Sequence, residues 1–181
     1  SEEVTLLEKD IFQEEIRKII SYVRSLGKEQ GCYIPVIVAG GIYDYKDFCE
    51  QFDLGADFVQ LGTRFVTTKE CDADEAYKQA YIKCKKKDIQ IIKSPVGMPG
   101  RALENAFIKQ SKEQRIPPQK CYNCISVCNP KETPYCITNA LIQAVKGDVE
   151  NGLIFCGANA WKESQIRTVK EVINEVLFST K

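Results

Sequence analysis

Histidine is absent from the sequence, and methionine and tryptophan each occur once among its 181 residues. The missing imidazole excludes a histidine acting as general base or metal ligand within this chain. The chain begins with Ser1, and its single methionine is Met98. We therefore expect the chain to start inside a longer natural sequence.

Neither sign of charge is in excess, because 25 lysine and arginine residues balance 25 aspartate and glutamate residues. This balance gives no electrostatic reason to expect nucleic acid or anionic lipid as a partner. No apolar run approaches the roughly 20 residues that a membrane-spanning helix needs, and no signal-peptide pattern opens the chain. We expect a cytoplasmic protein that binds a small-molecule substrate, not nucleic acid or a membrane, and that could form a homodimer.

The composition is otherwise that of an ordinary globular protein, with 44% apolar and 28% charged residues. This length is sufficient for a domain with a real hydrophobic core. Nine cysteines are present. Because no export signal accompanies them, reduced thiols or metal ligands are a better expectation than disulfides.

Residues 34–65 carry the most informative pattern of the chain, a predicted strand, helix and second strand. Residues 34–38 form a nearly all-apolar, β-branched run, which predicts a strand buried on both faces of a parallel sheet. Ala39, Gly40 and Gly41 follow it. Adjacent glycines can adopt positive φ and let backbone N–H groups point at an anion.

A helix and a second strand complete this unit. Asp44 is expected to cap the helix, Gly55 to end it, and Phe48, Cys49 and Phe52 to form its apolar face. Residues 57–61 predict a second buried strand, and the turn Gly62-Thr63 follows.

Two successive parallel strands that end in Gly-Gly and Gly-Thr match the phosphate site of a (β/α)8 barrel, which the loops after strands seven and eight form. The pattern therefore predicts a phosphorylated ligand, because each turn offers N–H donors. Tight βα turns without a ligand remain the alternative for either turn alone.

The segments PVIVAGGI and LGADFVQLGTRF resemble the flavin-phosphate segment of the nitronate monooxygenases (2-nitropropane dioxygenases) and the related flavin-dependent enoyl-acyl-carrier-protein reductases. TTKEC at 67–71, SPVGMPGRALEN at 94–105 and GLIFCGANA at 152–160 resemble other segments of that family. The resemblance covers most of the chain from about residue 30. It implies an α/β fold, the C-terminal part of an FMN-binding (β/α)8 TIM barrel, with a cysteine-containing helical extension.

The resemblance also implies roles for particular residues. The base histidine of the family is expected upstream of this chain. Cys156 and Asn159 would lie beside the flavin ring, and Met98 and Arg101 would border the substrate pocket; structural roles for these four remain open. The phosphate of FMN would be held by Ala39, Gly40, Gly41, Gln60, Gly62 and Thr63.

Four cysteines fall within sixteen residues as Cys121-x2-Cys124-x3-Cys128-x7-Cys136. Thiolates are soft ligands, and four at close range could bind zinc or an iron–sulfur cluster. The spacing matches neither a zinc ribbon nor a bacterial ferredoxin. A group of reduced, partly buried thiols is therefore the alternative, because cysteine also packs as a small hydrophobe.

The rest of the chain predicts core-packing helices and one further strand. We divide the chain into barrel units with the phosphate turns (1–93), a loop, helix and cysteine-rich insertion (94–150), and a closing strand or loop with a final barrel-packing helix (151–181). A strand is expected at 89–93, and helices are expected at 11–26, at 72–86, from Ala102, at 134–145 and at 163–178.

Three functions fit these observations. The first is an FMN-dependent oxidoreductase that oxidises alkyl nitronates with dioxygen. The second is an FMN- and NAD(P)H-dependent enoyl-acyl-carrier-protein reductase, which a crotonyl thioester substrate would identify. The third is a non-enzymatic metal-binding module, which predicts tight zinc or iron and no flavin.

Overall fold

The computed structural model describes residues 2–126 and 128–178, and of residues 2–9 only the helical backbone. Contacts divide the chain into two compact units. The first unit comprises residues up to Leu61 together with residues from Ile173 on, and the second comprises residues 62–172. No helix among the described residues is long and apolar enough to cross a membrane.

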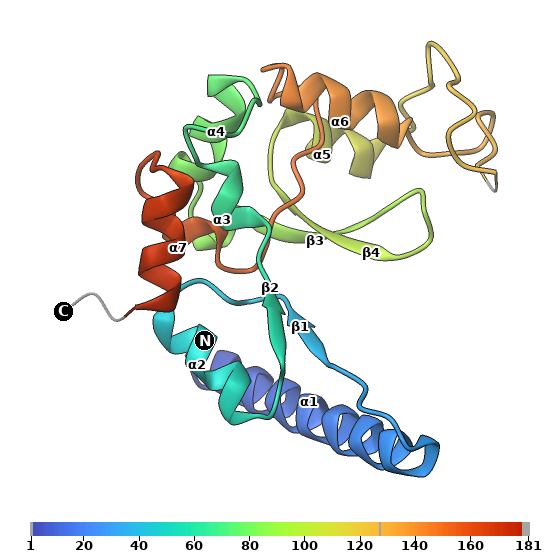
Figure 1. Ribbon diagram of the computed structural model, residues 1–181. Helices are drawn as coiled ribbons and strands as arrows, with labels where there is room; N and C mark the ends of the chain where they lie inside the picture. Colours follow the sequence, from blue (N-terminus) through green and yellow to red (C-terminus); the bar gives the residue numbers. More distant parts are fainter. Residues whose placement is uncertain (1, 127, 179–181) are drawn as a thin grey trace. The chain divides into compact units, whose positions relative to one another are not determined.

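The first unit packs two helices against a pair of strands (Figure 1). In chain order its elements are α1 (Glu2–Gln30), β1 (Ile37–Ala39), α2 (Tyr45–Asp53) and β2 (Phe58–Gln60). Ile16 and Ile20 of α1 share a small buried core with Val38 of β1, and Leu54 and Ala56 complete it.

The first helix is longer than predicted, since it begins at Glu2 and passes through Gly27 to Gln30. We expected Gly27 to end it, and that was wrong; Gly31, at φ +65°, follows the last turn instead. Gly27 has a different use. A Cβ at Gly27 would lie 2.6 Å from the carbonyl oxygen of Cys32, so the missing side chain lets the returning chain pass close to the helix.

The two strands of the first unit are parallel, as predicted, and pair Ile37 with Phe58 and Ala39 with Gln60. They are shorter than the predicted runs, and the prediction that both faces are buried was wrong. Val38 is buried, but Ile37 is 61% exposed and Phe58 is 58% exposed. The described sheet has two strands, and the core that α1 forms with it contains Val38 alone from β1.

The helix after β1 agrees with its predicted cap. The Asp44 side chain accepts a hydrogen bond from the Asp47 N–H (3.0 Å), and Gly55, at φ +99°, follows the C-cap Leu54. Phe48 and Phe52 contact each other with ring centroids 4.7 Å apart. Phe52 is 40% exposed, so the predicted apolar face of α2 is only partly covered.

The second unit is built around an antiparallel hairpin and the helices that cover it (Figure 1). The 3-10 helices η1 (Lys86–Asp88) and η2 (Ala160–Lys162) join its main elements. These main elements are α3 (Thr63–Val66), α4 (Glu75–Lys83), β3 (Ile89–Lys93), β4 (Pro99–Leu103), α5 (Ala106–Glu113), α6 (Ile137–Val145) and α7 (Val169–Leu177), the last of which runs into the first unit.

The hairpin corrects a prediction. Strand β3 has the predicted bounds, but β4 lies where we expected a loop and the start of a helix at Ala102. Helix α5 begins instead at Ala106, where the Asn105 side chain accepts from the Ile108 N–H (2.9 Å) and caps the helix. The same Asn105 amide donates to the carbonyls of Val149 (2.6 Å) and Gly152 (2.8 Å).

The segment after Gly152 lies along β4. Leu103 N donates to the Ile154 carbonyl (3.0 Å), and Cys156 N donates to the Arg101 carbonyl (2.9 Å). A Cβ at Gly100 would lie 2.4 Å from the Phe155 ring, so the ring packs directly on the hairpin backbone. These contacts place residues 153–156 against the hairpin.

Helices α4, α6 and α7 begin later in the chain than predicted, and polar side chains cap α4 and α7. Asp74 caps α4 by accepting from the Ala76 N–H (2.8 Å). Before α7, Thr168 and Glu171 form a capping box, in which the Glu171 N–H donates to the Thr168 hydroxyl and the Thr168 N–H donates to the Glu171 carboxylate. Helix α6 begins after Cys136, not at Pro134.

Candidate functional site

The turn after β1 has the conformation that its glycines predict. Gly40 has φ +99° and Gly41 has φ +75°, a backbone region that residues with a Cβ rarely adopt. An added Cβ at either position would meet no atom within 4 Å. The requirement for glycine is therefore one of backbone conformation, and the space beside both residues is open to a ligand.

The register of the first unit aligns the ends of its two strands. Ala39 lies opposite Gln60 in a parallel pair, so both carboxyl ends lie at the same edge of the sheet. The side chains of Ala39 and Gln60 are both exposed. Ligands of α/β folds bind at this edge, outside the carboxyl ends of parallel strands.

The Gly62-Thr63 turn starts the second unit and has a different geometry. Gly62 has φ −123° and precedes α3 as its N-cap, so it does not use the left-handed region. The Thr63 hydroxyl oxygen accepts a hydrogen bond from the Gly157 N–H (2.8 Å). A Cβ at Gly157 would lie 3.0 Å from that oxygen. The structure thus joins Thr63 to the 156–160 segment, two sequence motifs that lie 94 residues apart.

Arg64, the residue that follows Thr63, forms a buried ion pair with Glu163. Arg64 Nη1 lies 3.1 Å from Glu163 Oε1 and 3.3 Å from Oε2, and the two side chains are 2% and 1% exposed. Burial raises the pKa of the Glu163 carboxyl, while Arg64 opposes this shift. The pair fixes α3, and therefore Thr63, to the segment after η2. Sequence reasoning missed it because the partners are 99 residues apart.

The four predicted pocket residues are only partly brought together. Arg101 in β4 and Cys156 are neighbours through the bond from Cys156 N to the Arg101 carbonyl (2.9 Å). Asn159 precedes η2 as its N-cap. Met98 lies in the hairpin turn, 72% exposed, at the end of the hairpin away from Leu103.

Cys156 is a neutral thiol in this environment. Burial raises the pKa of the Cys156 thiol to about 12, and the positive charge of Arg101 offsets only part of that effect. A reactive thiolate would require a pKa close to or below neutral pH. Cys156 is therefore suited to lining a pocket and not to acting as a nucleophile.

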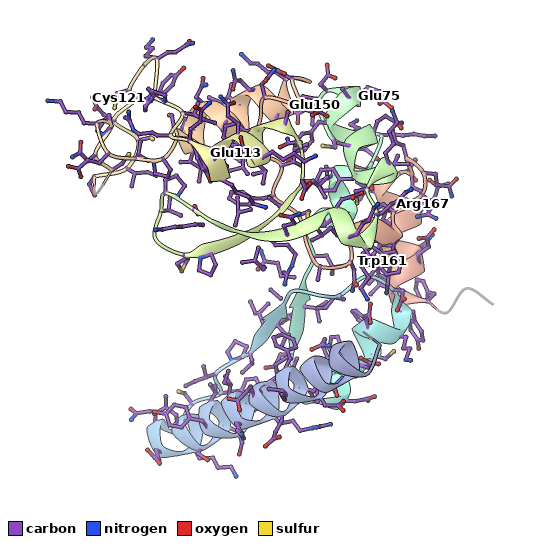
Figure 2. All side chains as sticks on the ribbon, turned by 180° about the vertical axis from the view of Figure 1, so that it is seen from behind. Glu75, Glu113, Cys121, Glu150, Trp161 and Arg167 are labelled. Carbon is purple, nitrogen blue, oxygen red and sulfur yellow. The ribbon has the colours of Figure 1, made fainter. Side chains whose placement is uncertain are left out.

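The four clustered cysteines lie in the second unit, in the segment between α5 and α6. All are free thiols; Cys121 and Cys124 are exposed, while Cys128 and Cys136 are half-buried. Figure 2 shows Cys121 in the irregular segment beyond α5, away from Trp161 and Arg167. Within the described ranges, no three histidine, cysteine, aspartate or glutamate side chains are grouped to hold a metal ion as they stand.

Comparison with known proteins identifies a family and several relatives. The family model described as nitronate monooxygenase matches residues 8–178. A probable nitronate monooxygenase of Staphylococcus saprophyticus is 40% identical over 80 residues, which are 44% of this chain and 22% of that protein. A probable nitronate monooxygenase of Staphylococcus haemolyticus is 37% identical over 92 residues, which are 50% of this chain and 26% of that protein.

Several solved structures, among them the following two, resemble the chain. FabK from Thermotoga maritima superposes with a TM-score of 0.67 at 30% identity, over 90% of this chain and 46% of that one. A nitroalkane oxidase from Streptomyces ansochromogenes superposes with a TM-score of 0.61 at 20% identity, over 89% of this chain and 42% of that one. The chain therefore matches about a quarter of the length of the curated relatives and less than half of either structure.

Proposed function

The chain belongs to the nitronate monooxygenase family, whose model matches residues 8–178, and we propose that the whole protein is an FMN-dependent oxidoreductase that oxidises alkyl nitronates with dioxygen. Flavin use is a property of this family, and the fold is of the TIM-barrel type. The observation that carries the proposal within this chain is the Gly40-Gly41 turn, which leaves the carboxyl end of a parallel strand with both residues at positive φ.

The residues of the turn fit a phosphate group. Successive backbone N–H groups near left-handed residues form a concave anion site, and the space where side chains would stand beside Gly40 and Gly41 is open. We infer that Ala39, Gly40, Gly41 and Gln60 of the first unit hold the phosphate of FMN. For Gly62 and Thr63 of the second unit, the resemblance of the LGTRF motif alone supports a role in phosphate binding.

Thr63 has one defined task in this proposal. Its hydroxyl oxygen already accepts the Gly157 N–H, and a hydroxyl group has a single donor. The O–H hydrogen is therefore left to donate to a phosphate oxygen. The buried Arg64–Glu163 pair prevents α3 from moving and keeps that hydroxyl in place.

FMN, when bound, would supply the redox chemistry that transfers electrons from the nitronate to dioxygen. This chain contributes binding and orientation. The neutral Cys156 thiol and the side chains of Arg101, Met98 and Asn159 are proposed to line the substrate pocket. The catalytic base is proposed to lie outside this chain, which has no histidine.

A second function has a specific observation in its favour. The FabK superposition covers 90% of this chain at 30% identity and exceeds the nitroalkane oxidase superposition in both identity and TM-score. An FMN- and NAD(P)H-dependent enoyl-acyl-carrier-protein reductase is therefore the alternative, because such enzymes share the flavin site but differ in electron donor and substrate.

One experiment tests both functions on the full-length protein. The purified protein is expected to show flavin absorbance and to consume dioxygen when an alkyl nitronate is added. Oxidation of NAD(P)H that depends on a crotonyl thioester, without nitronate-dependent oxygen uptake, would establish the alternative. A protein that is colourless and cannot be reconstituted with FMN would reject both.

A further inference from the structure

The four clustered cysteines surround a single cavity in the second unit. Cys121, Cys124, Cys128 and Cys136 all line a space of about 70 Å³, which the neighbouring hairpin turn borders through Pro95. No histidine, aspartate or glutamate is among its lining residues. The lining therefore offers four thiols and neither imidazole nor carboxylate, and thiolates select soft metals such as zinc.

Two of the sulfur atoms accept hydrogen bonds. The Asn123 N–H lies 3.4 Å from Cys121 Sγ, and the Thr138 hydroxyl lies 2.9 Å from Cys124 Sγ. The first bond depends on an unusual backbone, because Asn123 is the only described residue other than glycine with positive φ (+49°). Hydrogen bonds to the sulfurs orient thiolate ligands and adjust their charge in metal sites.

The positions of the other two cysteines suit the same site. Cys136 is the N-cap of α6, which has nine residues, and the positive end of a helix dipole favours a negatively charged group there. The Cys128 N–H donates to the Ile125 carbonyl (3.1 Å). All four cysteines line the same cavity.

Packing alone does not account for this arrangement. A cysteine that serves as a small hydrophobe is normally buried, yet Cys121 and Cys124 are exposed. Between α5 and α6 the described residues also form no helix or strand that could hold the segment by itself. Its position depends on contacts such as those from Arg115 to the carbonyls of Thr133 (2.9 Å) and Pro130 (2.7 Å).

We propose that Cys121, Cys124, Cys128 and Cys136 bind one zinc ion through four thiolates. The sulfurs do not stand at ligand geometry as described, so zinc draws the segment inward around the cavity. Such coupling between metal binding and local folding is usual where ligands come from irregular backbone. Each thiol releases its proton as it coordinates, and the ion fastens the 121–136 segment beside the hairpin turn.

The test is metal analysis of the full-length protein purified without added chelator under anaerobic conditions. We expect about one equivalent of zinc per chain, and less than about one tenth of an equivalent in Cys124→Ser and Cys128→Ser. Cys32→Ser is the matched control, because Cys32 is an exposed free thiol outside the cluster; it should retain the zinc of the wild type. Replacement by cobalt should give the absorption of tetrahedral thiolate coordination.

A second variant keeps all four ligands and so avoids loss of the fold. Thr138→Val removes the hydroxyl that donates to Cys124 Sγ and should weaken zinc binding about tenfold in competition with a chromogenic chelator. Metal-free protein with four reactive thiols, or with disulfides among these cysteines, would overturn the proposal. Iron and inorganic sulfide in place of zinc would overturn the zinc assignment. Unchanged zinc affinity in Thr138→Val would overturn the role of that hydroxyl.

Discussion

At the scale of single residues, alanine substitutions at three glycines can distinguish the effect of backbone strain from the effect of lost ligand binding. Gly31, Gly40 and Gly41 all have positive φ, and at each an added Cβ would meet nothing within 4 Å. Replacing any of them by alanine imposes a similar conformational penalty of roughly 1 kcal/mol. Gly31, however, ends α1, whereas Gly40 and Gly41 follow the strand whose carboxyl end faces the proposed phosphate site.

We predict that Gly40→Ala and Gly41→Ala weaken FMN binding by the full-length protein about tenfold or more, the effect of losing roughly one charge-assisted hydrogen bond. Gly31→Ala should lose similar stability and keep the wild-type dissociation constant. Fluorescence titration of the apoprotein with FMN measures both. Equal FMN affinities in Gly41→Ala and Gly31→Ala would show that the turn does not bind the cofactor.

The buried Arg64–Glu163 pair makes a prediction about stability. Glu163→Gln leaves the Arg64 charge buried without its counter-ion and should destabilise the protein by about 3 kcal/mol. The double variant Arg64→Met/Glu163→Leu should recover much of this loss, because neither charge of the buried pair remains. Urea denaturation midpoints measure the changes.

The control for Glu163→Gln is the substitution of a solvent-exposed carboxylate. Glu15→Gln removes a carboxylate that contacts Lys18 at 2.8 Å on the exposed face of α1, and the midpoint should not move measurably because surface pairs contribute little. If Glu163→Gln unfolded at the urea concentration of the wild type, Arg64 and Glu163 would not form the ion pair described.

At the scale of elements, one carboxylate joins α1 to the strands of the first unit. The Asp57 side chain accepts hydrogen bonds from Arg24 Nη2 (2.7 Å), from the Val36 N–H (2.6 Å) and from the Tyr33 hydroxyl. The Tyr33 and Arg24 bonds, with that from Val36, lower the pKa of the Asp57 carboxyl to about 2. The ionised form is therefore the one that holds these elements together.

This shift predicts an acid-dependent loss of stability. A carboxyl whose pKa is lower in the folded protein stabilises it above the unfolded-state pKa, and that contribution disappears as the pH falls through the folded-state value. Between about pH 4 and pH 2 the wild type should lose the stability that ionised Asp57 contributes. Asp57→Asn lacks this contribution at every pH, so its stability should change less over this range. Urea midpoints of both proteins across this range should converge as the pH falls, and parallel curves would contradict the prediction.

The elements also show what sequence patterns could and could not predict. Strand β3 and the Asp44 cap were predicted correctly because each depends on local chemistry. Strand β4 was missed because its residues pair with β3 across a turn, and the Ser94–Gly97 stretch indicates a turn without indicating its partner. The Asn105 cap was a readable signal that α5 begins later than Ala102.

Some features of the candidate site could likewise be predicted from the sequence, and others could not. Positive φ at Gly40 and Gly41 could be predicted because only glycine adopts it without cost. The bond from Gly157 to Thr63 and the Arg64–Glu163 pair could not, because each joins residues more than 90 positions apart. Contacts at such separation depend on the packed fold and leave no periodic pattern in the chain.

At the scale of the whole molecule, the chain covers less than half of the FabK structure. In the proposed function it supplies the phosphate grip and part of the pocket, while other parts of the protein supply the remaining flavin contacts and the base. We predict that the 181-residue chain alone binds FMN about 100-fold more weakly than the full-length protein, because fewer contacts offset the cost of association. Equilibrium dialysis compares the two, and equal affinities would confine the flavin site to this chain.

The packing of Phe155 on Gly100 has a consequence for how this family can diversify. The ring, together with the bonds from Leu103 to Ile154 and from Cys156 to Arg101, holds β4 along residues 100–103. The outer part of the hairpin turn, residues 96–98, is exposed, and Met98 is 72% exposed. Substitution of the exposed Met98 side chain should therefore leave the strand register unchanged, so the rim of the proposed pocket can vary while the strand that supports it does not.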